Sequence, residues 1–313
     1  MADAYDPEFL DVAAETLKEV NQGEYPSAYV TSVLKTARKI ARDYLCRPPE
    51  DLREIDDTIA LQKVNYQGIA PRNMAKLRQF NDTRIQQAID LSAVLLRDID
   101  ASIQRKRKAA RKSDGCLPRA ADVVDPELGR DIMAALAHDI LLARAPRSEN
   151  VVKARLDWVT WQDGRARIVV PAAQVKMRSA GDADLTIQLG KAASKLLKTY
   201  LETVRPAILT ASQKENPYLF PAQGKTNADG HYAGLLKRVT ARLHEKVGVR
   251  INPHLYRHLI GWIWLRDSLD HLPKVQRLLG HKRLQTTIDH YAELDETLIS
   301  NEWLAHLDSR SAA

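Results

Sequence analysis

The stretch NPHLYRH, residues 252–258, opens the part of the sequence around which the rest is organised. An apolar run typical of a helix follows it, and then come LLGH at 278–281 and TTIDHY at 286–291. An arginine binds two phosphate oxygens at once, and a histidine can donate or move a proton near neutral pH. A tyrosine hydroxyl can act as a covalent nucleophile when a neighbouring charge activates it. Together these residue types predict chemistry on a phosphate.

The composition is that of a folded, soluble protein. The chain has 313 residues, of which 44% are apolar, and this predicts one large domain or two ordinary ones. No apolar run is long enough to span a membrane, and the acidic start MADAYDPEFLDV lacks the pattern of a signal peptide. We therefore expect a cytoplasmic protein, associated with the nucleoid if it binds DNA.

The net charge and the cysteines narrow the class of partner. The formal charge of +7 favours a polyanion such as nucleic acid, although it discriminates only weakly. Cys46 and Cys116 have no metal-ligand spacing, so we expect both to be reduced packing residues.

Residues 1–104 predict a small helical domain. Apolar spacing indicates a helix over 26–45, which two prolines end, and further helices are expected within 51–104. Cationic side chains, Arg38 and Arg72 among them, fall on the polar faces of these helices. They either contact DNA or form a solvated surface, and the pattern favours neither alternative.

A basic run separates this domain from the rest of the chain. It reads RKRKAARKSDG over 105–115 and is typical of a helix end that continues into a linker, here 105–118. Such a run can be a solvated tail, but its place between two domains favours contact with a DNA backbone. The candidate DNA-binding residues are Arg105, Lys106, Arg107 and Lys108.

The pattern beyond residue 119 is mixed. Asp125 and Pro126 are typical of the start of a helix. Three strands are expected, the first two joined by an Asp-Gly turn: 158–161, 167–170 and 185–189. Helices resume after residue 191. The predicted fold class is mainly α with a small antiparallel β-sheet, an α+β fold.

This second half resembles the catalytic domain of the tyrosine recombinase, or phage integrase, family. The family's H-x-x-R box is matched by His254 and Arg257, its Leu-Gly-His element by 279–281, and its Thr-Thr and Tyr ending by 286–291. Each piece alone is weak, and the combination at this spacing is specific. The helical first domain resembles the family's core-binding domain only in position and helix content.

Two further positions follow from the resemblance. The family places an arginine after a helix, and Arg147 fits, although Pro146 is unusual there and makes Arg144 a lesser candidate. Its lysine lies on a β-turn, which indicates Lys176, with Arg178 nearby.

The resemblance implies a set of roles at the site. The two arginines would hold the phosphate, the lysine would protonate the leaving 5′ oxygen, and the histidines would bind the phosphate and manage the tyrosine proton. The tyrosine would form a 3′-phosphotyrosyl intermediate, so neither ATP nor a metal or other cofactor is needed. The implied catalytic residues are Arg147, Lys176, His254, Arg257, His281 and Tyr291.

Simpler interpretations exist for each residue. His254 and His258 have the spacing of two zinc ligands on a helix, but Arg257 between them would repel a cation. His281 alone is typical of a helix-end histidine, and Tyr291 alone of a half-buried aromatic residue. At the level of the whole protein, the alternatives are a type IB topoisomerase and a non-catalytic DNA-binding protein on the same scaffold. The Leu-Gly-His and Thr-Thr elements favour the recombinase.

The resemblance also implies partners. These are a double-stranded DNA recombination site of a phage or other mobile element, and three further copies of the chain on DNA, with a monomer in solution. The last segment carries an apolar stripe that either docks on a neighbouring subunit, as an exchange segment, or folds back on its own domain. An N-terminal arm-binding domain is either lacking or removed. The sequence of the target site cannot be read from these residues.

Overall fold

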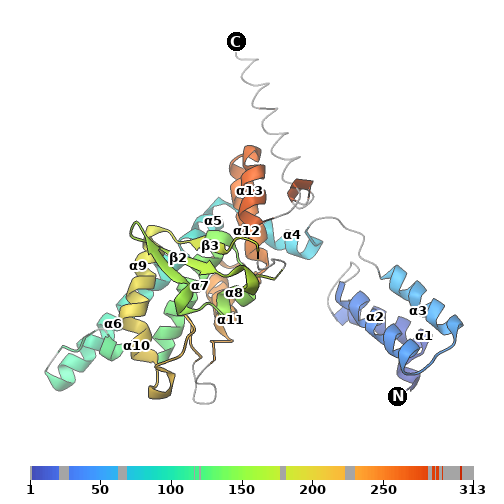
Figure 1. Cartoon of the computed structure of the whole chain (residues 1–313), viewed down its shortest axis with the longest axis horizontal. Helices are drawn as coiled ribbons and strands as arrows, with labels where there is room; N and C mark the ends of the chain where they lie inside the picture. Colours follow the sequence, from blue (N-terminus) through green and yellow to red (C-terminus); the bar gives the residue numbers. More distant parts are fainter. Residues whose placement is uncertain are drawn as a thin grey trace, which may run out of the picture. The chain divides into compact units, whose positions relative to one another are not determined.

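The computed structural model describes most of the chain as two compact units. They comprise Met1–Gln67 and Gly68–Ala313 (Figure 1). The described residues are 2–20, 28–62, 69–115, 117–119, 121–176, 181–222, 230–280, 284–285, 287–288, 291 and 304.

The first unit is a bundle of three helices. They are α1 (Pro7–Val20), α2 (Ala28–Asp43) and α3 (Pro49–Leu61). Leu10, Leu34 and Ile55 meet in its apolar core. Cys46 is exposed, so the prediction that it packs inside is wrong, because it follows the end of α2 with a positive φ of 48°. Cys116 lies outside the described residues.

The second unit begins with three helices that its core requires. They are α4 (Pro71–Leu77), α5 (Asp82–Ile89) and α6 (Leu91–Asp114). Leu95 and Ile99 of α6 are buried in the same apolar core as the helices that follow. Arg266 donates to the carbonyl of Phe80 at 2.9 Å, which attaches the chain between α4 and α5 to a helix nearly 190 residues away.

The boundary between the units therefore differs from the one expected at 104. Residues 105–114 continue α6 without a break, and Gly115 ends the helix with a φ of 73°. Arginine, lysine and alanine are all good helix formers, so a basic run need not leave a helix. The division falls instead between Gln67 and Gly68.

Helix α7 (Pro126–Arg144) is the central helix of the second unit. Asp125 caps it by accepting a bond from the amide of Leu128 at 2.9 Å. Most of its residues from Leu128 to Leu141 are buried. It ends at Ala145, which adopts the left-handed conformation with a φ of 40°.

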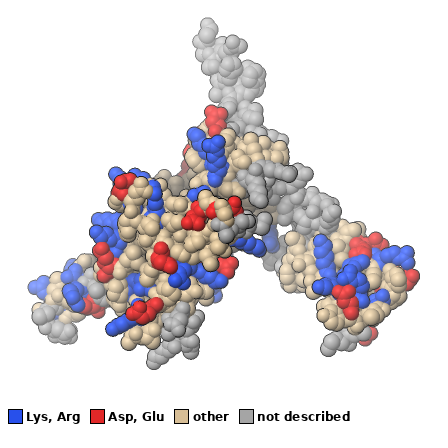
Figure 2. Space-filling model, in the orientation of Figure 1, with Lys and Arg blue, Asp and Glu red and all other residues tan. Residues whose placement is uncertain are grey.

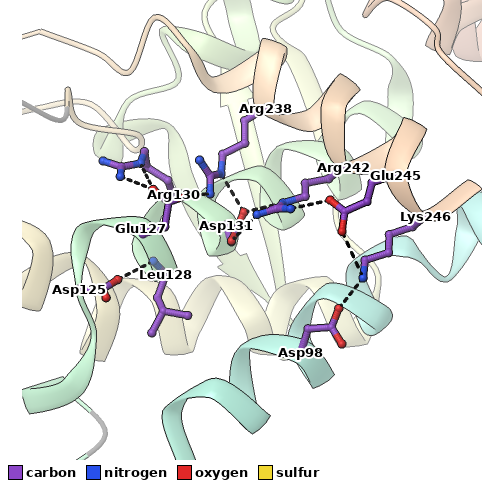
Figure 3. Close-up of polar contacts among 10 residues, drawn as sticks. All are labelled: Asp98, Asp125, Glu127, Leu128, Arg130, Asp131, Arg238, Arg242, Glu245 and Lys246. Carbon is purple, nitrogen blue, oxygen red and sulfur yellow. Dashed lines mark hydrogen bonds and ion pairs between the residues drawn. The ribbon is translucent and has the colours of Figure 1, made fainter. Parts of the chain in front are cut away.

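Ion pairs hold α11 (Leu235–Val247) against α7 (Figure 3). The Asp131 carboxylate accepts bonds from Arg238 at 2.8 Å and from Arg242 at 2.9 Å. Lys246 at the end of α11 pairs with Asp98 of α6 at 2.8 Å. Three helices from distant parts of the chain are thus joined by one chain of charges.

The sheet has the predicted hairpin and third strand. Its strands are β1 (Val159–Gln162), β2 (Arg165–Val170) and β3 (Leu185–Gln188), antiparallel in the order β1-β2-β3. Ile168 of β2 lies opposite Val159 on one side and Ile187 on the other. Asp163 and Gly164 turn the hairpin with φ angles of 50° and 72°, as a two-residue turn of this type requires.

Helices complete the second unit around the sheet and α7. The short helix α8 (Ser148–Val152) follows α7, and α9 (Lys191–Thr199) and α10 (Arg205–Ile208) follow the sheet. Helices α12 (Leu255–Asp267) and α13 (Leu272–Leu279) come last among the helices with described bounds. Trp262 is buried in the core, and Trp264 is partly buried against it. The predicted fold class, mainly α with a small antiparallel sheet, is confirmed.

The described part of the chain has neither a membrane-spanning helix nor a cluster of metal-binding side chains. None of its helices is long and apolar enough to cross a membrane. Within the same residues, no group of three or more His, Cys, Asp or Glu side chains could hold a metal ion.

Candidate active site

A cavity of about 420 Å³ lies where the ends of α7 and α13 meet the start of α12. The short helix α8 and the connection between β2 and β3 complete its wall. It contains four cationic side chains and one carboxylate. The lining residues are Arg144, Pro146, Arg147, Asn150, Val175, Lys176, Asp182, Ala183, Leu185, Arg257, Leu278, Leu279 and Gly280.

Arg257 is one of the partly buried cations of this wall. It lies in the first turn of α12, and its guanidinium donates to the carbonyl of Ala145 at 3.0 Å and to the carbonyl of Leu279. Burial and the positive charge of Arg147 lower the pKa of Arg257, although an arginine stays protonated at neutral pH. The ends of α7 and α13 therefore fix the position of this charge without cancelling it.

Arg147 approaches the cavity from the start of α8. It precedes the helix in an extended conformation, and its Nη1 donates to the carbonyl of Lys176 at 3.0 Å. Arg144, the lesser candidate, also lines the cavity and donates to the carbonyl of Thr186 at 2.6 Å. The structure thus brings together both arginines that the sequence pattern offered for the first box.

Lys176 lies in the connection between β2 and β3, where the turn was expected. Its side chain is exposed and lines the cavity beside Arg147. Gathering Arg147, Lys176 and Arg257 around one hollow is electrostatically unfavourable unless an anion binds there. The arrangement suits a phosphate group, whose oxygens accept bonds from guanidinium and ammonium groups. Arg178 lies outside the described residues.

Asn150, Asp182 and Ala183 also line the cavity and are not among the predicted catalytic residues. Asn150 is buried and donates to the carbonyl of Gln174 at 2.9 Å, which attaches α8 to the β2–β3 connection that carries Lys176. The sequence signal for Asn150 is its position three residues after Arg147. Asp182 and Ala183 line the cavity from the same connection, and no pattern in the sequence marks them.

The two histidines of the predicted set are not part of the described wall. His254 is exposed and lies one residue before α12, and it does not line the cavity. His281 lies outside the described residues, as does Thr286.

Tyr291 is not among the residues that line the cavity, and it is buried with an exposed fraction of 1%. Its hydroxyl donates to the backbone carbonyls of Arg257 and His258 at 3.4 and 3.5 Å. A Cβ added to Gly261 would stand 2.1 Å from the hydroxyl oxygen. Burial raises the pKa of Tyr291, and the charge of Arg257 offsets only part of that rise. In this arrangement the hydroxyl faces the backbone of α12 and is poorly placed to lose its proton.

The predicted DNA-binding residues differ in whether their charge is available. Arg38 forms an ion pair with Asp56 within the first unit, and Lys106 forms one with Asp125. The Nε of Arg107 donates to the carbonyl of Pro118 at 2.7 Å. The remaining three are exposed: Arg72, Arg105 and Lys108. Figure 2 shows cationic side chains interspersed with acidic ones over the visible face.

Comparison with known proteins gives independent evidence about the family that this chain resembles. Residues 126–297 match the sequence model of the phage integrase family, more than half of the chain. The tyrosine recombinase XerD of Caulobacter vibrioides is 27% identical over 284 residues, 85% of each chain. A tyrosine recombinase XerC of Lacticaseibacillus casei is 30% identical over 139 residues, 43% of this chain and 44% of its own. A post-cleavage complex of the XerH site-specific recombinase with palindromic difH substrate covers 93% of this chain and 70% of its own, at 17% identity and a TM-score of 0.49.

Proposed function

The chain belongs to the phage integrase family, and from this membership and its cationic cavity we propose that it is a tyrosine-type site-specific DNA recombinase. The enzyme breaks and rejoins DNA strands through a 3′-phosphotyrosyl intermediate. The observation that carries this proposal is the convergence of Arg147, Lys176 and Arg257 on one cavity, with both arginines held by neutral carbonyls.

The arginines solve the main difficulty of the reaction. A DNA phosphodiester is negatively charged and repels a nucleophile. Arg147 and Arg257 bind its non-bridging oxygens and stabilise the additional charge of the pentacoordinate transition state. His254 and His281 donate further hydrogen bonds to the phosphate when DNA is bound.

The bond changes are balanced without an outside energy source. The Tyr291 oxygen gives its proton to one of the two histidines, His254 or His281, and forms a bond to phosphorus while the bond from phosphorus to the 5′ oxygen breaks. Lys176 gives its proton to the departing 5′ oxygen. A second 5′-hydroxyl then reverses the reaction and releases the tyrosine, so strand joining needs no ATP, metal or other cofactor.

Tyr291 must move for this reaction to occur. Its hydroxyl is bonded to the α12 backbone and is enclosed. DNA binding, or a neighbouring subunit, supplies the free energy that brings it to the phosphate. The described arrangement is then a resting state of the nucleophile.

The physiological partners follow from the same proposal. The substrate is a double-stranded recombination site, and four subunits assemble on paired sites from monomers, in the cytoplasm at the nucleoid. The reaction integrates or excises a phage or other mobile element. The helices before α7 act as the core-binding part, and the segment after Tyr291, in which the structure describes only Leu304, docks on a neighbouring subunit.

Trapping of covalently bound DNA tests the proposal. The protein is incubated with genomic fragments from its own host, denatured, and the attached DNA is sequenced. We expect attachment through a 3′ phosphate at one preferred sequence, and none with Tyr291→Phe, which removes only the nucleophilic oxygen. Labelled half-sites carrying that sequence should then undergo strand transfer. Relaxation of supercoils without transfer would indicate a topoisomerase, and binding without any adduct would indicate a non-catalytic DNA-binding protein.

A further inference from the structure

A buried hydrogen-bond chain lies next to Arg257. His138 of α7 is fully buried, and its two ring nitrogens have separate partners. Nε2 lies 2.8 Å from the carbonyl oxygen of Ala88 in α5, and Nδ1 lies 2.7 Å from the hydroxyl of Tyr256 in α12. Tyr256 is fully buried as well and directly precedes Arg257. This hydrogen-bond chain thus connects α5, α7 and α12, and it ends at the residue next to Arg257, which lines the cavity.

The direction of each bond follows from the chemistry of its partners. A carbonyl oxygen only accepts, so Nε2 of His138 carries the hydrogen. Burial lowers the pKa of His138 to about 4, so at neutral pH the ring has one hydrogen and Nδ1 must accept. The Tyr256 hydroxyl therefore donates to Nδ1, and each donor in the chain has a single possible acceptor. A chain of this kind holds its members in one orientation.

Helix α7 holds the first turn of α12 at two points. His138 binds Tyr256, and seven residues later the carbonyl of Ala145 accepts from Arg257. His138 lies nearly two turns before the end of α7 and Ala145 caps that end, so the two contacts are about 10 Å apart along the helix axis. Two fixed points prevent α12 from rotating about its axis, whereas one would not. The direction of the Arg257 side chain depends on that rotation.

We propose that His138 and Tyr256 are a positioning pair that orients α12 so that the Arg257 guanidinium faces the phosphate. The inference rests on the proposed recombinase function, because it assigns these residues to the arginine of that site. Neither residue touches the DNA. The bond to Ala88 makes α5 the far support of the pair, so that the helices before α7 contribute to the geometry of the cavity.

The primary test compares two tyrosines that each lose one hydroxyl. Tyr256→Phe breaks the bond to His138 and keeps the ring. Tyr200→Phe is the matched control, because Tyr200 is also fully buried in the second unit and donates to the carbonyl of Leu219 at 2.8 Å. Covalent capture is measured at saturating DNA, on a duplex that carries the trapped site. We expect Tyr256→Phe to be slower by on the order of tenfold with unchanged DNA affinity, and the control to change by less than about twofold.

A neutral substrate shows whether the defect acts through Arg257. A methylphosphonate at the cleavage point removes the negative charge that the arginine binds. On this substrate the gap between wild type and Tyr256→Phe should narrow to less than about twofold, because correct placement of the guanidinium no longer matters. An equal gap on both substrates would overturn the proposed role and leave a purely structural bond. Arg257→Ala is run in parallel, and normal cleavage of the ordinary phosphodiester by that variant would refute the proposed function itself.

Two variants of His138 keep the test decisive if Tyr256→Phe folds poorly. His138→Asn places an amide near the position of Nδ1 and can still accept from Tyr256. His138→Leu has similar volume and accepts nothing. Urea unfolding shows whether the asparagine and leucine variants are folded to the same extent, and rates are compared between preparations that match in this respect. The asparagine variant should then cleave several-fold faster than the leucine variant, and equal rates would contradict the proposal.

Discussion

At the scale of single residues, the absence of a side chain at Gly261 leaves room for the hydroxyl of Tyr291, the proposed nucleophile. The Tyr291 hydroxyl occupies the space beside Gly261 that a Cβ would fill, and the ring lies 6.4 Å from that of His258. A glycine inside a helix normally destabilises it relative to alanine by about 1 kcal/mol. Its presence in α12 is explained by the close approach of Tyr291.

Gly261→Ala should expel Tyr291 from this resting position. The new methyl group would overlap the hydroxyl, and the hydroxyl would move toward solvent. If the described position is a resting state, covalent capture of DNA should be retained and should accelerate by about threefold, since less free energy is needed to release the tyrosine. The rate is measured at saturating DNA. Loss of capture in a folded protein would instead show that the tyrosine reacts from this position.

Asp139, next to the positioning pair, is a buried acid with an unusual titration. Burial raises its pKa to about 6, and a bond from the Ser92 hydroxyl at 2.6 Å offsets part of that rise. Because the folded pKa is above the unfolded value, the native state binds the proton more tightly. The associated stability is present below about pH 4 and is lost as the pH rises through about 6.

Asp139→Asn should therefore stabilise the protein most at alkaline pH. The amide keeps the bond to Ser92 and removes the buried charge. From the shift in pKa we expect a gain in unfolding free energy of about 3 kcal/mol at pH 8 and about 1 kcal/mol at pH 4.5. Urea unfolding at the two pH values measures both gains. A gain that does not change with pH would show that Asp139 titrates normally.

At the scale of elements, the packing of α11 on α7 depends on one carboxylate. Asp131 is largely buried between Arg238 and Arg242. Burial raises the pKa of Asp131, but the bonds from these two arginines outweigh it and lower the pKa below its usual value. Removing the carboxylate from such a cluster leaves the two guanidinium groups partly buried and without a counter-charge.

Asp131→Asn should reduce the free energy of unfolding by about 2 kcal/mol, because two partly buried guanidinium groups lose their counter-charge. Glu245→Gln is the matched control. Glu245 also pairs with Arg242, but its side chain is about half exposed, so the loss should stay below about 0.5 kcal/mol. Urea unfolding compares them. Equal losses would mean that the Asp131 cluster is as weak as a surface ion pair.

Other elements show how far the sequence alone could lead. The Asp163-Gly164 turn between two short strand-like runs predicted the hairpin, because this signal is local. The domain boundary expected at 104 differs from the structure because the basic run has high helix propensity and continues α6. That α6 belongs to the second unit becomes clear only from its packing in the same core as α7.

The site shows the same limit. Resemblance to the family's motifs indicated Arg147, Lys176 and Arg257, which the fold gathers into one cavity. The position of the Tyr291 hydroxyl against α12 depends on contacts between segments more than thirty residues apart, and no spacing rule contains them. The pairing of His138 with Tyr256 spans 118 residues and is equally invisible in the sequence.

At the scale of the whole molecule, net charge alone does not show which cations reach DNA. The chain carries +7. Lys106 is committed to Asp125, whereas Lys108, two residues along the same helix, is exposed. A cation that already has an acidic partner releases few counterions on binding, because its charge is neutralised before DNA arrives. The basic run of α6 therefore contains two kinds of lysine.

Lys108→Gln and Lys106→Gln should separate these two kinds. DNA affinity is measured for each at several salt concentrations, on the trapped site and on an unrelated duplex. If Lys108 neutralises one phosphate, its loss should flatten the slope of log affinity against log salt by about 0.9. Lys106→Gln should leave the slope unchanged, because Asp125 already neutralises Lys106. Both duplexes should respond alike, since phosphate contacts carry no sequence information. Equal slopes for Lys108→Gln and wild type would place Lys108 in solvent, and a flattened slope for Lys106→Gln would show that DNA displaces Asp125 from its lysine.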